Sequence, residues 1–268
     1  MHNFASFNGQ LCDTSSPRIP APASGGLYGK GIFTTIAIHE GGPFLWDKHW
    51  GRIERDAARL AIDLDEFPEA ATQKALGDLT TTNSIQNGRA RIAFFDESST
   101  ALWPYEAKRS TGLLIMTADF RPVAEKFKLT LSPHLINSTS PLAAVKSCNY
   151  LEKIIAKDES KRRGFDEAIQ LNERGEISSG CMANVFWLKG GKLFTPSLET
   201  GCLQGTTREF VLENIDCEEA EVGIEELRSA NEIFLTSAGI GVVQVAEFEG
   251  RQLQHDDHTI MKLLRSGS

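Results

Sequence analysis

The segment Ala143–Lys153 has the sequence AAVKSCNYLEK, and the rest of the chain is best understood by starting from it. Its first lysine, Lys146, follows Ala, Ala and Val, so we expect lost hydration to disfavour the charged amine and to lower its pKa. An amine of this kind is nucleophilic enough to form a Schiff base with a carbonyl group. The segment therefore predicts a reactive lysine at position 146.

Two later segments add a possible anion site. Residues 175–187 read GEISSGCMANVFW, and residues 201–208 read GCLQGTTR. Thr206 and Thr207 lie at the expected start of a helix, where free backbone N–H groups and the helix dipole attract anions. An ordinary helix cap is the alternative interpretation. A reactive amine and a phosphate site together predict a cofactor that carries an aldehyde and a phosphate.

The bulk composition narrows the class of protein. A chain of 268 residues can bury a sizeable core and form two domains. Its net charge of -8 comes from interspersed acidic and basic residues, which argues against nucleic-acid binding. Five widely spaced cysteines without a CxxC pair are typical of reduced thiols, not of a metal site. Without a signal-peptide pattern or a membrane-spanning apolar run, we expect a cytoplasmic protein with no membrane partner.

Hydrophobic periodicity organises the first half of the chain. A run rich in β-branched and aromatic residues predicts a strand at Ile32–Ile38, and the helical spacing of apolar residues after the next turn predicts an amphipathic helix from Asp47 onward. We therefore expect residues 1–120 to form a small α+β domain. The other elements expected in this domain are a helix at 68–79 and strands at 89–95 and 113–120.

The second half is expected to form a larger domain. Residues 121–128 have no clear period and are predicted to link it, as residues 129–268, to the first domain. A long helix is expected from about residue 148 to Gly164, with Leu151, Ile154 and Ile155 facing inward. The remaining expected elements are strands at 129–131, 168–171, 185–188, 192–194, 232–236 and 242–245, and helices at 207–214 and 257–264.

These segments, in this order, resemble the class IV aminotransferases, the pyridoxal-phosphate enzymes of fold type IV. That family includes branched-chain and D-amino acid aminotransferases and 4-amino-4-deoxychorismate lyase. The resemblance covers nearly the whole chain, from the opening Phe7-Asn8-Gly9 to the C-terminal strands. It implies an α/β protein of the D-amino acid aminotransferase-like fold, with an α+β N-terminal domain and an α/β-barrel-like C-terminal domain. It also implies pyridoxal 5′-phosphate (PLP) as cofactor and a homodimer.

The resemblance assigns catalysis to Lys146, which would form the Schiff base and then move the substrate proton. A surface lysine at the start of a helix is the alternative. If residues 146–150 are helical, Asn149 and Tyr150 share the side of the lysine. The family places this tyrosine near the O3′ oxygen of the cofactor, although Tyr150 as a half-buried core residue is an equal alternative.

The resemblance also assigns the phosphate end of the cofactor. Residues 49–53, HWGRI, match a family segment whose arginine binds the phosphate, a task that suits the forked guanidinium of Arg52. A solvated arginine on a helix flank is the alternative. The family also implies Thr206, Thr207, Ser237 and Ala238 around the phosphate, although Ala238 stands where the family usually has a threonine. Leu203 would pack on the pyridine ring, and a plain core leucine is an equal alternative.

One departure from the family changes the expected chemistry. The family has a glutamate that pairs with the pyridine nitrogen, but in GEISSG, residues 175–180, Ser179 stands in its place. A hydroxyl can donate to a neutral nitrogen but cannot hold a proton there as a carboxylate does. Glu176 is three positions away on an expected strand and points to the other face. Transamination should suffer from this change more than elimination does.

A second departure concerns the substrate. The arginine-containing loop that holds the substrate carboxylate in some relatives is missing after the third strand, and Arg89 and Arg91 are the candidate replacements, of which Arg91 is the one predicted. A solvated arginine on an edge strand is the alternative. Tyr28 and Thr35 are predicted to line the substrate pocket. The FTT of residues 33–35 and the ANVFW of residues 183–187 are similar to the aminodeoxychorismate lyases.

Three functions follow from the resemblance. The first is transfer of an amino group between an amino acid and a 2-oxo acid, which is the commonest activity of the family. The second is 4-amino-4-deoxychorismate lyase activity, favoured by Ser179 and by the FTT and ANVFW details. The third is a non-catalytic relative that keeps the fold and binds PLP or another ligand weakly, favoured by Ser179 and by the missing carboxylate arginine.

Overall fold

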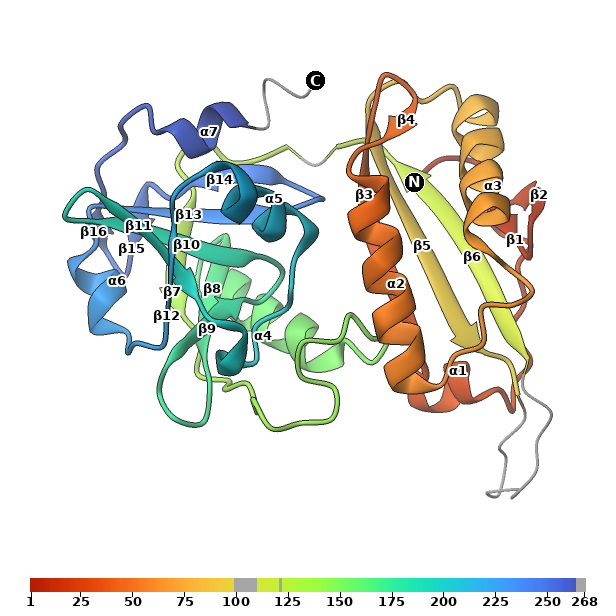
Figure 1. Ribbon diagram of the computed structural model, residues 1–268, viewed down its shortest axis with the longest axis horizontal. Coiled ribbons are helices and arrows are strands. Elements are labelled where there is room, and N and C mark those ends of the chain that lie inside the picture. The colour runs from red at the N-terminus through yellow and green to blue at the C-terminus, as the bar shows by residue number, and fades with distance from the viewer. Residues whose placement is uncertain (99–109, 121, 264–268) are drawn as a thin grey trace. The chain divides into compact units, whose positions relative to one another are not determined.

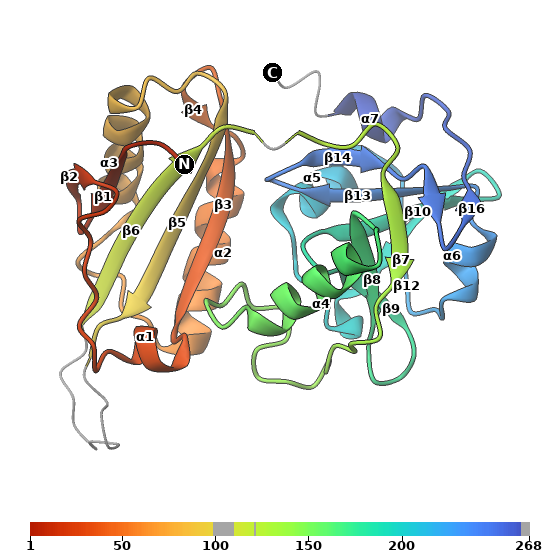
Figure 2. The ribbon, with the colours of Figure 1, turned by 180° about the vertical axis from the view of Figure 1, so that it is seen from behind.

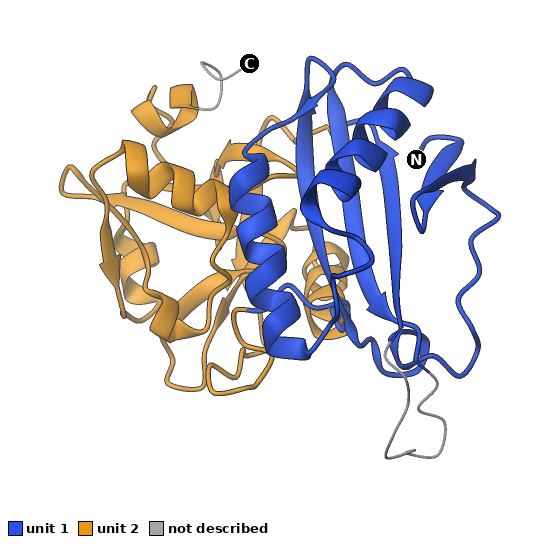
Figure 3. Ribbon diagram, turned by 45° about the vertical axis from the view of Figure 1, so that its right-hand side comes forward, with its two compact units in different colours: residues 1–120, 145–150 blue, residues 121–144, 151–268 orange. Residues whose placement is uncertain are grey.

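The computed structural model describes residues 1–98, 110–120 and 122–263. The chain forms two compact units, coloured separately in Figure 3: Met1–Phe120 with Val145–Tyr150, and Arg121–Ala144 with Leu151–Ser268. The sequence placed residues 129–268 in one domain, whereas residues 145–150, which include Lys146, pack with the first unit. Among the described residues, no helix is both long enough and apolar enough to cross a membrane.

The first unit is built on a six-stranded sheet with the order β2-β1-β6-β5-β3-β4. Helices α2 (Trp46–Leu60) and α3 (Glu69–Thr82) lie on the same face of this sheet, in front of it in Figure 1 and behind it in Figure 2. The remaining elements are β1 (Phe4–Phe7), β2 (Gln10–Asp13), α1 (Ser24–Tyr28), β3 (Gly31–His39), β4 (Gly42–Pro43), β5 (Gly88–Asp96) and β6 (Thr111–Ala118).

Helix α2 forms because its apolar residues recur at helical spacing. Trp50, Ile53 and Ala57 are at most 6% exposed and belong to the same core cluster as Ile32 and Ile36 of β3. Arg55 and Arg59 are on the solvent side. Three polar residues share the buried side of the helix: His49, Arg52 and Asp56.

The segment that carries Lys146 is extended, not helical. The N–H of Phe33 donates to the carbonyl of Lys146 (2.9 Å), and the N–H of Cys148 donates to the carbonyl of Gly31 (2.8 Å). Ser147 thereby forms an antiparallel bridge with Ile32 at the edge of β3. The predicted helix from residue 148 is wrong at its start, because pairing with β3 holds this segment and α4 begins only at Leu151.

The second unit contains two five-stranded sheets, with the orders β12-β11-β10-β13-β14 and β16-β15-β7-β8-β9. Its helices are α4 (Leu151–Arg162), α5 (Thr206–Asn214), α6 (Glu225–Ser229) and α7 (Thr259–Leu263). Its strands are β7 (Lys128–Leu131), β8 (Glu167–Leu171), β9 (Ile177–Gly180), β10 (Asn184–Lys189), β11 (Lys192–Pro196), β12 (Glu218–Ala220), β13 (Glu232–Ser237), β14 (Gly241–Gln244), β15 (Glu247–Phe248) and β16 (Arg251–Gln252).

The side of helix α4 that faces the sheet is the opposite of the predicted one. Leu151, Ile154 and Ile155 are 61%, 43% and 44% exposed, whereas Ala156 and Ser160 are fully buried. The inward side is largely polar, because lysines on this side have partners on β8 and β9. The predicted inward positions of the three apolar residues are therefore wrong.

Candidate functional site

The main chain of Lys146 is fixed by two elements of the first unit. Its carbonyl accepts from β3, and its N–H donates to Asp56 Oδ2 of α2 at 3.0 Å. Asp56 is only 7% exposed, and this burial raises the pKa of its carboxyl, while the hydrogen bond from Lys146 and the charge of Arg52 oppose the rise. Asp56 is therefore a positioning residue for the lysine.

The side chain of Lys146 lies among aromatic groups. Its Nζ donates to the Tyr150 hydroxyl at 3.4 Å and lies 4.6 Å from the ring centre of Phe33 and 4.9 Å from that of Tyr150. Phe33 and Tyr150 pack edge to face at 5.2 Å. The structure therefore brings the predicted pair Lys146 and Tyr150 together, although through an extended segment and not through a shared helix side.

Replacing Asp56 tests its positioning role. We expect Asp56→Ala to leave the Lys146 N–H without its acceptor and to lower the free energy of unfolding by about 1–3 kcal/mol. Burial makes the ionised carboxylate the costly form of Asp56, so Asp56→Asn, which keeps an acceptor oxygen and cannot ionise, should cost less. Thermal unfolding of the two variants checks this order. Equal losses for both would show that the charge, and not the acceptor, matters.

Arg52 is buried in a polar cluster inside the first unit. It is 4% exposed, and its Nη2 donates to Thr34 Oγ1 at 2.7 Å. The Thr34 hydroxyl lies 2.6 Å from His49 Nδ1, and burial with the charges of Arg52 and Lys146 holds the pKa of His49 well below its usual value. Because Thr34 accepts from Arg52, its own proton goes to Nδ1, and the neutral His49 carries its proton on Nε2. The solvated alternative for Arg52 is wrong.

The predicted substrate residues lie on strands and a helix of the same unit. Thr35 and Arg91 are direct partners across β3 and β5, and the Arg91 guanidinium lies 3.7 Å from the ring centre of Phe33. Strand β5 pairs with both β3 and β6, so it is not an edge strand, although Arg91 itself is exposed. Tyr28, at the end of α1, is 48% exposed.

In the second unit, the start of α5 is packed against one asparagine. Thr206 and Thr207, the first two residues of α5, are 3% and 5% exposed, and the helix has no side-chain cap. Asn184 Nδ2 donates to the carbonyl of Leu203 at 2.8 Å, which fixes the turn before the helix. A Cβ atom on Gly205 would lie 2.0 Å from Asn184 Oδ1, so only glycine fits there. The ordinary side-chain cap is therefore not the arrangement seen.

The same asparagine connects this helix start to β13. Asn184 pairs with Thr236 across β10 and β13, and Ser237 follows as the last residue of β13, with Ala238 next. Ser237 and Ala238 are partly exposed. The second unit therefore gathers its predicted phosphate residues around Asn184, while the predicted Arg52 belongs to the first unit.

Ser179 lies on β9 beside a lysine that the sequence did not single out. It is 5% exposed and pairs with Gln170 of β8. Lys153 Nζ of α4 donates to Ser179 Oγ at 3.3 Å and to Gln170 Oε1 at 2.8 Å. Glu176 is bound by Arg174 and Asn172, so it is engaged away from Ser179, as expected from its position.

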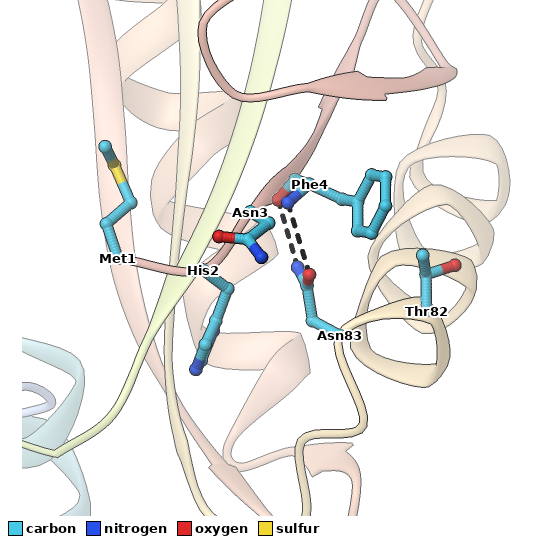
Figure 4. A pocket seen from close by; sticks show the side chains of 6 residues that line it. All are labelled: Met1, His2, Asn3, Phe4, Thr82 and Asn83. Carbon is cyan, nitrogen blue, oxygen red and sulfur yellow. Dashed lines mark hydrogen bonds between the residues drawn. The ribbon is translucent and has the colours of Figure 1, made fainter.

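A surface depression near the N-terminus contains none of the predicted site residues. It is lined by Met1, His2, Asn3, Phe4, Thr82 and Asn83. Asn83 accepts from the Phe4 N–H at 3.3 Å and donates to the Phe4 carbonyl at 3.0 Å, as the dashed lines in Figure 4 show. This amide ties β1 to the end of α3, which is a structural role.

Sequence reasoning missed three residues that contact predicted site residues within their own units: Asp56 in the first unit, and Asn184 and Lys153 in the second. Asp56 had a signal, because His49, Arg52 and Asp56 recur at helical spacing on the apolar side of α2. Asn184 was visible as an amide within an apolar strand sequence. Lys153 had no such signal, because its role depends on contacts with β8 and β9, which lie later in the sequence.

Comparison with known proteins identifies the family. A family model described as amino-transferase class IV matches residues 31–248, which is most of the chain. The protein belongs to the class IV aminotransferases. It is thus a member of an enzyme family whose named relatives include both transferases and a lyase.

Two curated relatives agree with this assignment. The chain is 28% identical over 260 residues to aminodeoxychorismate lyase of Bacillus subtilis, covering 90% of this chain and 85% of the relative. It is 26% identical over 253 residues to D-alanine aminotransferase of Bacillus licheniformis, covering 92% of this chain and 89% of the relative.

A solved structure agrees as well. The branched-chain aminotransferase of Thermoproteus uzoniensis with norvaline matches with a TM-score of 0.90 at 24% identity, covering 99% of this chain and 93% of that one. This match shows the shared fold.

Proposed function

We propose that the protein is a PLP-dependent enzyme that transfers an amino group between an amino acid and a 2-oxo acid, with Lys146 as its catalytic residue. The observation that carries this proposal is that both the main chain and the side-chain amine of Lys146 are held by neighbouring groups. Its main chain is held by Asp56 and β3, while its amine lies 3.4 Å from the Tyr150 hydroxyl. A base with a fixed main chain and a long side chain can take a proton from one carbon and return it to the next.

The residues of the second unit fit a phosphate. The start of α5 offers backbone N–H groups without a side-chain cap, beside the buried Thr206 and Thr207. Gly205 has no Cβ atom, so the Asn184 amide can pack directly against the start of the helix, where a Cβ atom would lie 2.0 Å from Asn184 Oδ1. We assign the phosphate to these residues with Ser237 and Arg52, and the pyridine ring to Leu203, with Tyr150 beside its hydroxyl oxygen. When bound, the cofactor supplies an aldehyde for the lysine and a ring that withdraws electrons.

The other residues would bind and orient the substrate. Arg91 is the cation proposed for the substrate carboxylate, and its guanidinium is held on the Phe33 ring. Thr35 lies directly opposite Arg91 on the neighbouring strand, so both present their side chains on the same face of the sheet. Tyr28 would line the outer part of the pocket.

A second candidate function is the lyase reaction that releases pyruvate from 4-amino-4-deoxychorismate and leaves 4-aminobenzoate. Ser179 favours it, because a reaction that passes electrons to a leaving group depends less on a protonated ring nitrogen. The similarity to the Bacillus subtilis lyase supports keeping this candidate.

A substrate panel separates the two candidates. We expect the purified protein with PLP to transfer amino groups from some D- or L-amino acid to a 2-oxo acid, measured as the new amino acid by chromatography. The same protein is then given aminodeoxychorismate and assayed for 4-aminobenzoate by fluorescence. Formation of 4-aminobenzoate without any amino transfer would replace the first candidate by the second. Neither product, with PLP bound, would leave a non-catalytic relative.

We also propose a cytoplasmic homodimer. Five unpaired cysteines support a reducing compartment. The exposed apolar residues of α4 support a protein surface that is covered in solution. Light scattering of the purified protein tests the dimer, and a monomeric mass at micromolar concentration would refute it.

A further inference from the structure

Lys153 is a cation to which the proposed reaction assigns no role. Its amine donates to Gln170 Oε1 at 2.8 Å and to Ser179 Oγ at 3.3 Å. Gln170 and Ser179 face each other across β8 and β9, and both are at most 5% exposed. Gln170 Nε2 donates to the His134 carbonyl at 3.2 Å, which fixes the amide so that Oε1 faces the lysine. The three side chains form one connected cluster inside the second unit.

The partners of Lys153 are neutral. The neighbouring acid, Glu167, is paired with Lys157 at 2.9 Å and also accepts from the Cys181 N–H. Within the part of the chain that the structure describes, Lys153 makes no ion pair. Burial lowers the pKa of Lys153 to about 8. The groups that oppose this shift are Cys181, Glu167, Cys202 and Glu152. At pH 7 the amine is therefore still mostly protonated.

We propose that Lys153 and Ser179 form the binding site for the pyridine nitrogen of the cofactor. Together they would keep that nitrogen unprotonated and hydrogen-bonded. This inference rests on the proposed function, in which a PLP ring is bound, and on the resemblance, which puts Ser179 in the place of the glutamate that pairs with the ring nitrogen. Because Ser179 Oγ already accepts from Lys153, its own proton is directed toward a further acceptor. An unprotonated ring nitrogen is such an acceptor, and a protonated one is not.

Charge leads to the same conclusion. A carboxylate beside the nitrogen favours its positive form, whereas an ammonium group in the same place disfavours it. Repulsion between two cations is strong in a buried setting, where little water screens it. The cluster therefore reverses the sign of the charge that the resemblance leads one to expect at this end of the ring.

The consequence concerns the choice of reaction. An unprotonated ring withdraws electrons less strongly, which slows a proton transfer that leaves the electrons on the cofactor. An elimination, in which the electrons depart with a leaving group of the substrate, is slowed less. Lys153 should thus set the balance between amino transfer and elimination at this site.

The test reads the protonation of the nitrogen directly. The protein is loaded with PLP carrying nitrogen-15 in its ring, and the ring resonance is recorded by NMR at pH 7. We expect the native protein to give the resonance of an unprotonated, hydrogen-bonded nitrogen. We expect Lys153→Met with Ser179→Glu, which removes the cation and supplies a carboxylate, to give the protonated resonance. Lys153→Met alone should move the native resonance measurably toward that of a less strongly hydrogen-bonded nitrogen.

Lys161→Met is the matched control, because Lys161 is exposed near the end of the same helix. It should leave the ring resonance unchanged. Folding of the cofactor-free variants is checked by thermal unfolding.

The pKa of Lys153 is about 8 in the folded chain against 10.5 as its ordinary value, so folding disfavours the protonated amine. Native stability should therefore rise between pH 8 and 10.5 relative to Lys153→Met.

The outcomes separate this inference from the function beneath it. Retained cofactor with a protonated ring nitrogen in the native protein would overturn the inference alone. So would an unchanged resonance in Lys153→Met that matches the Lys161→Met control. If the native protein retains no labelled cofactor, the proposed function fails, and this inference fails with it.

Discussion

Lys146→Ala is expected to abolish amino transfer, with a loss of at least about 10⁴-fold, because one amine serves as both nucleophile and proton carrier. In the native protein, borohydride should reduce the bond between lysine and cofactor to a stable one. Peptide mass spectrometry should then find the added mass on the peptide that contains residue 146. In Lys146→Ala this modified peptide should be absent.

Two further variants keep the Lys146 result interpretable. Lys146→Arg keeps a positive charge but cannot form the bond, so it should be as inactive as Lys146→Ala. Lys161→Ala removes an exposed lysine and should retain native activity. Modification found on Lys153 instead of Lys146 would transfer the catalytic role to the lysine of α4 and contradict the proposal.

Gly205→Ala is expected to weaken PLP binding by roughly 10- to 100-fold. The new methyl group would lie 2.0 Å from Asn184 Oδ1, so either the asparagine or the start of α5 must move. Overpacking of this kind costs about 1–3 kcal/mol, and each ~1.4 kcal/mol expressed in binding is a factor of ten. Fluorescence titration of the cofactor-free protein with PLP measures the change.

Gly77→Ala is the control for the glycine change. Gly77 is exposed on α3 and has no atom within 4 Å of an added Cβ. Alanine there should leave PLP binding unchanged and increase stability slightly, as is usual inside a helix. If Gly205→Ala binds PLP as tightly as Gly77→Ala, the phosphate does not lie at the start of α5.

Most of the fold could be predicted from local pattern. Strand β3 and helix α2 appear where the run of β-branched and aromatic residues and the helical spacing placed them, because β3 is buried along nearly its whole length and α2 buries one apolar side. The same approach predicted the wrong inward side for α4. It assumed that Leu151 and Ile154 face the core, whereas the core side is set by polar partners of Lys153 and Lys157 on β8. Local periodicity contains no information on such distant partners.

The candidate site shows the same limit. Lys146, Ser179 and Thr206 were identified because each lies in a short segment with a recognisable order of residues. The extended form of residues 145–150 was not predicted, because β3, which holds the segment, lies far before it in the sequence. The helical spacing of Asp56 could have shown that it is buried, but its role as the acceptor of the Lys146 N–H depends on that distant pairing.

The pairing of residues 145–150 with β3 also limits how the chain can be divided. The backbone leaves the first unit after Phe120, returns for residues 145–150, and leaves again at Leu151. A fragment that stops at residue 120 would retain Arg52 and Asp56 but would lack Lys146, the proposed catalytic residue. Part of the outer edge of β3 would also be exposed and prone to self-association. Neither half can therefore be produced as a complete, independent module by a single cut in the gene.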